Sequence, residues 1–467
     1  MPNSAPDPGS LPHPIHSRLP RPAAALWCLF GVAALLAPAL WNGWPIVFFD
    51  TAGYVRRVLE MDLEPGRSLF YGLFLWAASG GWVTLWGPVL AQAALVLWLV
   101  HLLLRTHGLG GDARGAALVA AVLSALTGIG WFTGQLMPDI LLPLLVLALW
   151  LLGFRWEHLG RGERAGLALL ALLGLLSHMS AMALALGLVL VTVAARVLAG
   201  WQGWDLRVRP LPVAGVVVAS LLLMPLLHLA LVGKATYTPG GPVFIFGRLL
   251  QDGVVQRWLD AECPRADIRL CAYRDRLPAT ANDFIWHDDS PFREIGWWGG
   301  ADAELARIVR ESVAAHPGAV LATSLTSTLA QLGEVETGDG LDEWQEVTNW
   351  VFRELVPQPG FAAARQQNGQ MTQALFDAVN TLHVPVAHLS LAGLVLAAFL
   401  AFRRGRADLG ALALFLLLAL LGNAVISGAL ANPHDRYQSR MIWIATLALG
   451  MAMAAIRRQG TAAHAPK

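Results

Sequence analysis

Residues 165–199 read AGLALLALLGLLSHMSAMALALGLVLVTVAARVLA, and this stretch decides how the chain must be arranged. As one helix it would be roughly 52 Å long at about 1.5 Å per residue, whereas the hydrocarbon core of a bilayer is about 30 Å thick. The polar interruption Ser177-His178-Met179-Ser180 lies near its middle. We therefore expect two membrane-spanning helices joined by a tight turn at His178.

The composition of the whole chain is typical of a membrane protein. Only 14% of the 467 residues are charged, against about 25% in an average soluble domain, and 56% are hydrophobic. Because a water-soluble core of this size has no room for so much apolar surface, we expect an all-α polytopic membrane protein. The net charge of +1 gives no reason to expect a nucleic-acid partner, and three cysteines are too few for a disulfide scaffold or a zinc-ribbon module.

Eight further apolar runs approach the ~20 residues needed to cross a bilayer. The first, at residues 23–41, is longer than a typical signal-peptide core and more spans follow it, so we interpret it as a retained helix. With the hairpin at residues 165–199, the runs predict ten transmembrane helices. The other runs lie at residues 83–104, 116–132, 136–154, 213–232, 384–402, 409–426 and 441–456.

The arginines predict the orientation. Residues 68–104 are also too long for one span, with a possible break at Gly80-Gly81, and we take them as one span preceded by an interfacial segment. The five basic clusters named below then fall on the side of the N-terminus, as the positive-inside bias predicts. Both termini are therefore predicted to be cytoplasmic, in a multi-pass protein of the cell inner (plasma) membrane. The clusters are Arg105 and Arg114; Arg155, Arg161 and Arg164; Arg196, Arg207 and Arg209; Arg403, Arg404 and Arg406; and Arg457 and Arg458.

This topology divides the chain into five parts. The segment between the seventh and eighth helices is far more polar than the rest and is large enough for a small folded domain, mostly helical or mixed. The last outer loop is predicted at residues 427–438. The parts are a cytoplasmic tail (1–22), helices one to seven with the first outer loop at 42–82 (23–232), the outer-face domain (233–383), helices eight to ten (384–456) and a second cytoplasmic tail (457–467).

The first outer loop contains the sequence WPIVFFDTAGYVRR, in which the acidic residue is Asp50. A carboxylate directly after an apolar run lies at the membrane boundary, where it could act as a general base toward a bound hydroxyl. Arginines at the same height could hold a phosphate. The structural alternative is that Asp50 caps a short helix and the arginines meet lipid headgroups, which is the simpler explanation for this loop alone. The candidate substrate-binding residues of the loop are Tyr54, Arg56, Arg57 and Arg67.

Two short outer turns add further candidates. Asp139 follows Pro138 and could be a second carboxylate beside Asp50, for a metal or for acceptor hydroxyls. The same Pro-Asp pair also suits the first turn of a helix. His178 could ligate a metal or contact a phosphate, although a histidine at a helical break more often satisfies backbone groups.

The last outer loop carries the run HDRYQSR directly before the final apolar run. A purely structural role does not explain a continuous polar run at the start of a span. Basic residues at the outer face also run against the positive-inside bias. We therefore interpret it as a binding site for an anionic headgroup or a diphosphate. Its candidate residues are His434, Arg436, Tyr437 and Arg440.

This layout resembles the GT-C superfamily of integral-membrane glycosyltransferases, which use polyprenyl-phosphate-linked sugars. The shared features are an Asp just after helix one, Pro-Asp at the second outer turn, His in the turn between helices five and six, a large late outer segment and Arg-Tyr before the last helix. The resemblance implies that Asp50 is the catalytic base or an acceptor-binding carboxylate, that Asp139 is a secondary acidic position and that Arg436 contacts the lipid phosphate. Many members have an acidic pair in the first loop, whereas Thr51 follows Asp50 here, so a divalent metal is left open.

The leading hypothesis is an inverting transfer of a sugar from a polyprenyl-phosphate carrier to a glycan, lipid or protein acceptor in the cell envelope. One alternative is a lipid or oligosaccharide transporter or flippase, which the nearly charge-free spans and the lack of an internal repeat disfavour. Another is a non-catalytic envelope assembly protein whose outer domain binds its partner. Trp297-Trp298-Gly299-Gly300 would suit a sugar-binding surface there, or an interfacial position.

The three cysteines give a prediction that depends on the orientation. Cys263 and Cys271 lie close together in the outer segment, on the oxidising side of the membrane where disulfides persist. We expect them to form a disulfide, while Cys28 stays a free thiol inside helix one.

Overall fold

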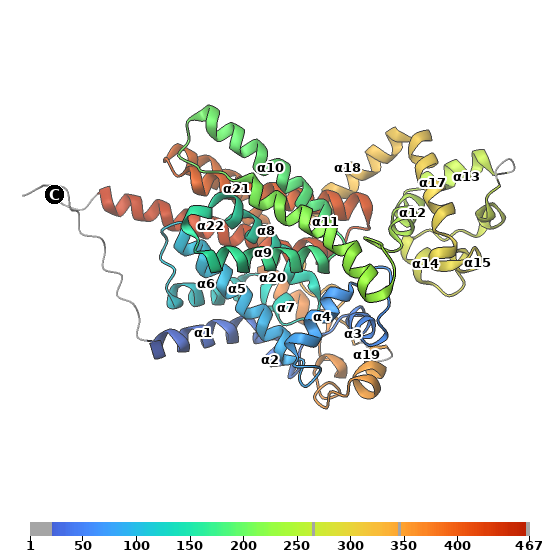
Figure 1. Cartoon of the computed structure of the whole chain (residues 1–467), viewed down its shortest axis with the longest axis horizontal. Helices are drawn as coiled ribbons and strands as arrows, with labels where there is room; N and C mark the ends of the chain where they lie inside the picture. Colours follow the sequence, from blue (N-terminus) through green and yellow to red (C-terminus); the bar gives the residue numbers. More distant parts are fainter. Residues whose placement is uncertain (1–20, 264–266, 344–346, 464–467) are drawn as a thin grey trace, which may run out of the picture.

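The computed structural model describes residues 21–263, 267–343 and 347–463. Within these residues the chain is all-helical, and its extended pairing is limited to isolated bridges such as the one between Ile46 and Gln135. Figure 1 shows long helices stacked side by side, with a group of shorter helices from the middle of the chain at one end. The prediction of an all-α protein is confirmed.

Six helices are long and apolar enough to cross a membrane, which is the architecture of a multi-pass membrane protein. They are α5 (Trp86–Thr106), α10 (Ala181–Gln202), α11 (Pro210–Val232), α20 (Gln373–Arg403), α21 (Ala407–Leu430) and α22 (Asp435–Ala463), the last counted as far as Gln459. Shorter apolar helices are α1 (Arg21–Leu35), α4 (Leu69–Ala78), α6 (Ala113–Leu126) and the segment Pro138–Phe154.

Helix α8 (Leu141–Phe154) forms the centre of the helical body. All 14 of its residues are buried, and it contacts α5, α9 (Arg161–Ser177), α11 and α21. The helices at the periphery of the bundle, by contrast, expose large apolar side chains, such as Leu211 of α11, which is 84% exposed. Surface of this kind suits a lipid environment, because lipid tails cover it without the cost that water would impose.

Both ambiguous stretches are interrupted where the apolar pattern fails. Helix α9 ends at Ser177 and α10 begins at Ala181, so the break lies at His178 as predicted. Helices α4 and α5 are separated by a turn in which Gly80 and Gly81 have φ values of 69° and 75°. Glycine adopts this left-handed backbone without a steric penalty, so the turn forms there. Both predicted breaks are confirmed.

The middle of the chain forms a helical group with its own core. Phe246, Leu259 and Phe284 are among the buried side chains that hold it together. Cys263 and Cys271 form a disulfide with their Cα atoms 5.4 Å apart, and Cys28 is free, as predicted. The group comprises α12 (Gly241–Gln251), α13 (Val254–Glu262), α14 (Ala281–Trp286), α15 (Pro291–Glu294), α16 (Trp297–Gly300) and α17 (Asp302–Ala315).

The later part of the segment at residues 233–383 also contacts the helical body and the first loop. Helix α18 (Pro317–Gly333) packs along α21. A Cβ atom at Gly428 would lie 2.6 Å from the Ser327 carbonyl oxygen, so the backbones of the two helices touch there. The chain then returns to the first loop, where the Gln366 side chain bonds both the amide and the carbonyl of Val47, at 3.0 and 2.9 Å.

The last helices begin earlier than their apolar runs. Helix α20 starts at Gln373 instead of residue 384, and α22 starts at Asp435 instead of residue 441. In α20 the early turns are polar because they are buried against another segment: Asn380 and His383 both bond Thr337, at 2.8–3.0 Å. The last loop is correspondingly shorter than predicted, because α21 continues to Leu430.

Candidate functional site

Backbone hydrogen bonds join the first loop to the turn at residues 134–139. The Ile46 amide donates to the Gly134 carbonyl at 2.9 Å, and the Leu136 amide donates to the Ile46 carbonyl at 2.8 Å. The Thr51 hydroxyl adds a bond to the Leu136 carbonyl at 3.1 Å. These contacts place the start of α3 (Thr51–Glu60), with Asp50, beside the turn that carries Asp139.

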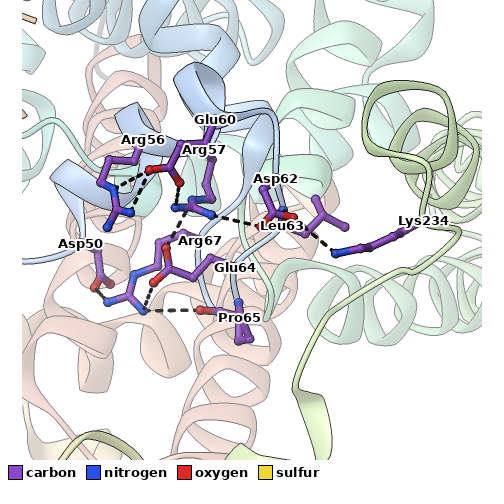
Figure 2. Close-up of polar contacts among 10 residues, drawn as sticks. All are labelled: Asp50, Arg56, Arg57, Glu60, Asp62, Leu63, Glu64, Pro65, Arg67 and Lys234. Atoms are coloured by element: carbon purple, nitrogen blue, oxygen red, sulfur yellow. Dashed lines mark hydrogen bonds and ion pairs between the residues drawn. The ribbon is translucent and has the colours of Figure 1, made fainter. Parts of the chain in front are cut away.

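Asp50 occupies the N-cap position of α3, but its side chain makes no capping hydrogen bond there. Its Oδ1 accepts a hydrogen bond from Arg67 Nη2 at 2.6 Å instead (Figure 2). The Arg67 side chain is 7% exposed and that of Asp50 is 23% exposed. The structure therefore holds the carboxylate against one cation and leaves part of it accessible, as a group that meets a substrate requires.

The other two arginines of the loop bind acidic neighbours. Figure 2 shows Arg56 and Arg57 both turned toward Glu60. Arg56 Nη2 donates to Glu60 at 2.8 Å, and Arg57 Nε also lies 3.3 Å from Glu64. Of the three predicted phosphate contacts in this loop, the structure brings Arg67 to Asp50 and places Arg56 and Arg57 in the Glu60 network.

Asp139 lies at the centre of a buried ionic cluster. Arg440 Nη1 donates to Asp139 Oδ1 at 2.9 Å, and Arg436 Nε lies 3.4 Å from the same oxygen. The same Arg440 nitrogen lies 2.8 Å from His178 Nε2. The side chains of Asp139 and Arg440 are each 1% exposed. With a neutral histidine, two guanidinium groups and one carboxylate leave this cluster with one surplus positive charge, which favours the binding of a further anion.

His178 is held neutral at the break between α9 and α10. Burial is the main cause that lowers its pKa to about 3, and Arg440 adds to the effect while Asp139 opposes it. Because a guanidinium can only donate, Nε2 faces Arg440 as an acceptor, while Nδ1 lies 2.9 Å from the Ser180 hydroxyl and 3.3 Å from the Ser180 amide nitrogen. His178 therefore orients Arg440.

Because His178 is buried in its neutral form, we expect the stability of the folded protein to fall at acidic pH, and we expect His178→Gln to reduce this loss. Below pH 6.5 the unfolded chain protonates this histidine while the folded chain does not, so folding stability falls with falling pH by up to about 1.4 kcal/mol per unit until about pH 3. Thermal unfolding in detergent between pH 4.5 and 7 measures the slope. The exposed His287, changed to Gln, is the matched control. Equal slopes for both variants would contradict the buried neutral state.

Aromatic rings surround the arginines. The Arg436 guanidinium carbon lies 4.0 Å from the Phe48 ring centre, and that of Arg440 lies 5.1 Å from the Tyr437 ring centre. Burial, followed by the nearby Asp50 carboxylate, raises the pKa of Tyr54 well above its ordinary value, so Tyr54 keeps its proton.

His434 lies at the edge of the ionic cluster, with its Nδ1 3.6 Å from Asp339.

Arg67 also lines a cavity that is open to solvent. Its lining combines polar and apolar side chains, which suits a ligand with a charged head and an apolar tail. Hydropathy alone does not predict this cavity. A histidine near the end of a span, such as His228, is the sequence feature that could have indicated it. The polar lining includes Glu64, Arg67, Ser68, His178, His228 and Tyr237, and the apolar lining includes Leu63, Leu175, Leu176, Met179 and Met224.

The residues present do not fit a divalent metal ion. The Asp50 and Asp139 carboxylates are each bound to arginine. Within the described residues, no group of three or more His, Cys, Asp or Glu side chains could hold a metal. Ion pairing of both acids with guanidinium groups leaves no cage of free oxygen ligands, so we derive no step through a metal.

No family model, no curated protein and no solved structure matches this chain. Its function is therefore inferred from the geometry of these residues.

Proposed function

We propose that the chain is a glycosyltransferase of the GT-C type, which moves a sugar from a polyprenyl-phosphate carrier to an acceptor at the outer face of the inner (plasma) membrane. The observation that carries the proposal is the position of Arg67, which binds Asp50 and also lines the cavity that combines polar and apolar side chains. In the proposed topology the ten predicted spans place both termini in the cytoplasm and the ionic cluster at the outer rim.

The donor would enter the cavity with its phosphate toward Arg67. Phosphate oxygens form short, charge-assisted hydrogen bonds with guanidinium groups, and the Leu and Met side chains of the cavity lining suit the isoprenoid chain. Arg440 lies 2.8 Å from Nε2 of His178, which lines the cavity, and the surplus positive charge of the buried cluster favours an anion there.

Asp50 would then serve as the base. The acceptor hydroxyl attacks the anomeric carbon from the face opposite the phosphate, and the bond between that carbon and the phosphate oxygen breaks. The electron pair leaves with polyprenyl phosphate, and the hydroxyl proton passes to Asp50. The product has the inverted configuration at the anomeric carbon.

Arg67 couples the two events. Before the donor binds, its Nη2 is occupied by Asp50 at 2.6 Å. The donor is a phosphodiester with one negative charge and two non-bridging oxygens, so it competes with the carboxylate for the same guanidinium. Asp50 becomes free to accept a proton once the donor occupies Arg67, which limits its action to the donor-bound state.

The two candidate phosphate ligands can be separated by mutation. We expect Arg67→Ala to lower the affinity for polyprenyl phosphate about tenfold or more, because it removes a charge-assisted contact, and Arg67→Lys to lower it less. Arg436→Ala should have a smaller effect than Arg67→Ala, since Arg436 lines a different and smaller cavity. Titration of each variant with polyprenyl phosphate in nanodiscs measures this. A larger loss in Arg436→Ala would move the phosphate to Arg436.

Comparison of cells with and without the protein tests the function itself. We expect cells that lack it to accumulate one sugar-loaded polyprenyl phosphate and to lose one sugar from a surface product. Restoration by the wild-type chain is the control. Accumulation of an intact lipid-linked oligosaccharide at the inner leaflet would instead indicate a flippase, and unchanged intermediates and products would reject both activities.

A further inference from the structure

Three aromatic side chains from the middle helical group form a surface beside the first loop. They are Phe244 of α12, Trp286 of α14 and Trp298 of α16, with ring centres 5.7–6.4 Å apart. Trp286 is 39% exposed, and the other two are half-buried. We call these three residues the aromatic platform.

The platform is one side chain away from Asp50. The Arg67 guanidinium carbon lies 5.1 Å from the centre of the Trp286 ring, and the same guanidinium donates to Asp50 at 2.6 Å. A ligand that covers the exposed part of Trp286 therefore lies next to the group that we propose as the base.

Local backbone features hold the platform against the loop. A Cβ atom at Gly240, where φ is +70°, would lie 2.8 Å from the Trp298 ring and 2.9 Å from Pro65 Cβ, so glycine is needed for this close approach. Trp297 has a φ of 55°, which a bulky residue rarely adopts. In this turn the Trp297 ring lies under Arg293, with the guanidinium carbon 3.9 Å from the ring centre, whereas the Trp298 ring packs against Phe244 in the platform.

We propose that the aromatic platform binds sugar rings of the acceptor, and hence that the acceptor is a glycan. This inference rests on the proposed function. A pyranose ring presents C–H groups on its faces and hydroxyl groups at its edge, so it matches an aromatic surface bordered by charged groups. Arg67 and Asp50 supply that border, and a ring bound on this surface would lie near the Arg67–Asp50 pair, because the Arg67 guanidinium lies over the Trp286 ring.

The surroundings of the platform favour a glycan over a lipid headgroup. Trp201, which is 81% exposed at the end of α10, has the position typical of a tryptophan at a membrane interface. Trp286 and Trp298 instead belong to the helical group with its own core, and Trp286 lies against a guanidinium of the first loop.

Linkage analysis of the labelled product tests the acceptor class. The full-length protein in nanodiscs is supplied with a radiolabelled sugar donor extracted from cells that lack it, together with membranes of those cells as the source of acceptor. We expect the label on the hydroxyl of another sugar. Label attached directly to a lipid or an amino acid would overturn this inference and leave the transferase activity standing, whereas donor that is neither transferred nor hydrolysed would overturn the proposed function.

Variants test the platform itself. We expect Trp286→Leu and Trp298→Leu each to raise the acceptor concentration for half-maximal rate about tenfold while the affinity for polyprenyl phosphate stays unchanged. Trp286→Phe keeps a ring and should retain most of the acceptor affinity. Trp201→Leu is the matched control for loss of an exposed indole. If the platform variants fold and behave like Trp201→Leu, the aromatic platform does not bind the acceptor.

Discussion

Asp50→Asn should lower the rate of sugar transfer about a hundredfold or more while the protein binds polyprenyl phosphate at least as tightly as the wild type. The amide keeps the shape of the side chain but cannot take the hydroxyl proton. It also frees Arg67, whose Nη2 donates to Asp50 at 2.6 Å, for the phosphate. Loss of turnover without loss of donor affinity therefore separates a base from a structural acid. Turnover and equilibrium donor binding are measured on the same preparation.

Asp62→Asn is the matched control for this experiment. Asp62 lies in the same loop and pairs with Lys234 at 3.4 Å, on the side of the Arg57 network away from Asp50 (Figure 2). Its loss should leave transfer near the wild-type rate. If Asp50→Asn retains most of the activity, Asp50 has only the structural role of binding Arg67.

Asp139→Asn should destabilise the protein by about 3–5 kcal/mol, the usual cost of leaving a buried charge without its partner. Asp139 and Arg440 are each 1% exposed, and Arg436 lies 3.4 Å from the same carboxylate oxygen. Removal of the carboxylate leaves two guanidinium groups facing each other in the interior. Thermal and denaturant unfolding in detergent measure the loss.

The double variant Asp139→Asn/Arg440→Gln provides the control. Removing one cation together with the carboxylate relieves part of the uncompensated charge, so it should be more stable than Asp139→Asn alone. Asp408→Asn is a second control, because Asp408 also pairs with an arginine, Arg406, at 3.0 Å but is 17% exposed. Equal unfolding temperatures for wild type and Asp139→Asn would show that the cluster contributes little to folding.

The sequence predicts the fold where local pattern decides it. Gly80-Gly81 and His178 interrupt apolar runs, and the helices break at both places. Hydropathy fails where a polar side chain is buried by a distant segment. Asn380 marks the early part of α20 as loop-like, yet its amide is satisfied by Thr337, 43 residues away. Such single pairs have no periodic signal.

The site was predictable to a similar degree. Asp50, Asp139, His178 and Arg440 stand out because they are polar at the ends of apolar runs. Their partners do not follow from spacing: Asp139 meets Arg440 across a separation of 301 residues. The contact between the aromatic platform and Arg67 does not follow from the sequence either, because Trp286 reaches Arg67 only when the middle helical group packs against the first loop.

The fully buried α8 has a consequence for the biogenesis of the protein. Its final neighbours include α21 and α22, which belong to the last part of the chain. Helix α21 begins about 250 residues after α8 ends. Because ribosomes add about 5–20 residues per second, α21 and α22 are synthesised tens of seconds after α8. During that interval lipid or an insertion chaperone must cover part of a helix that touches neither in the finished protein. Stalled synthesis before α21 should therefore leave α8 accessible to photo-crosslinking by lipid, and completion of the chain should remove that contact.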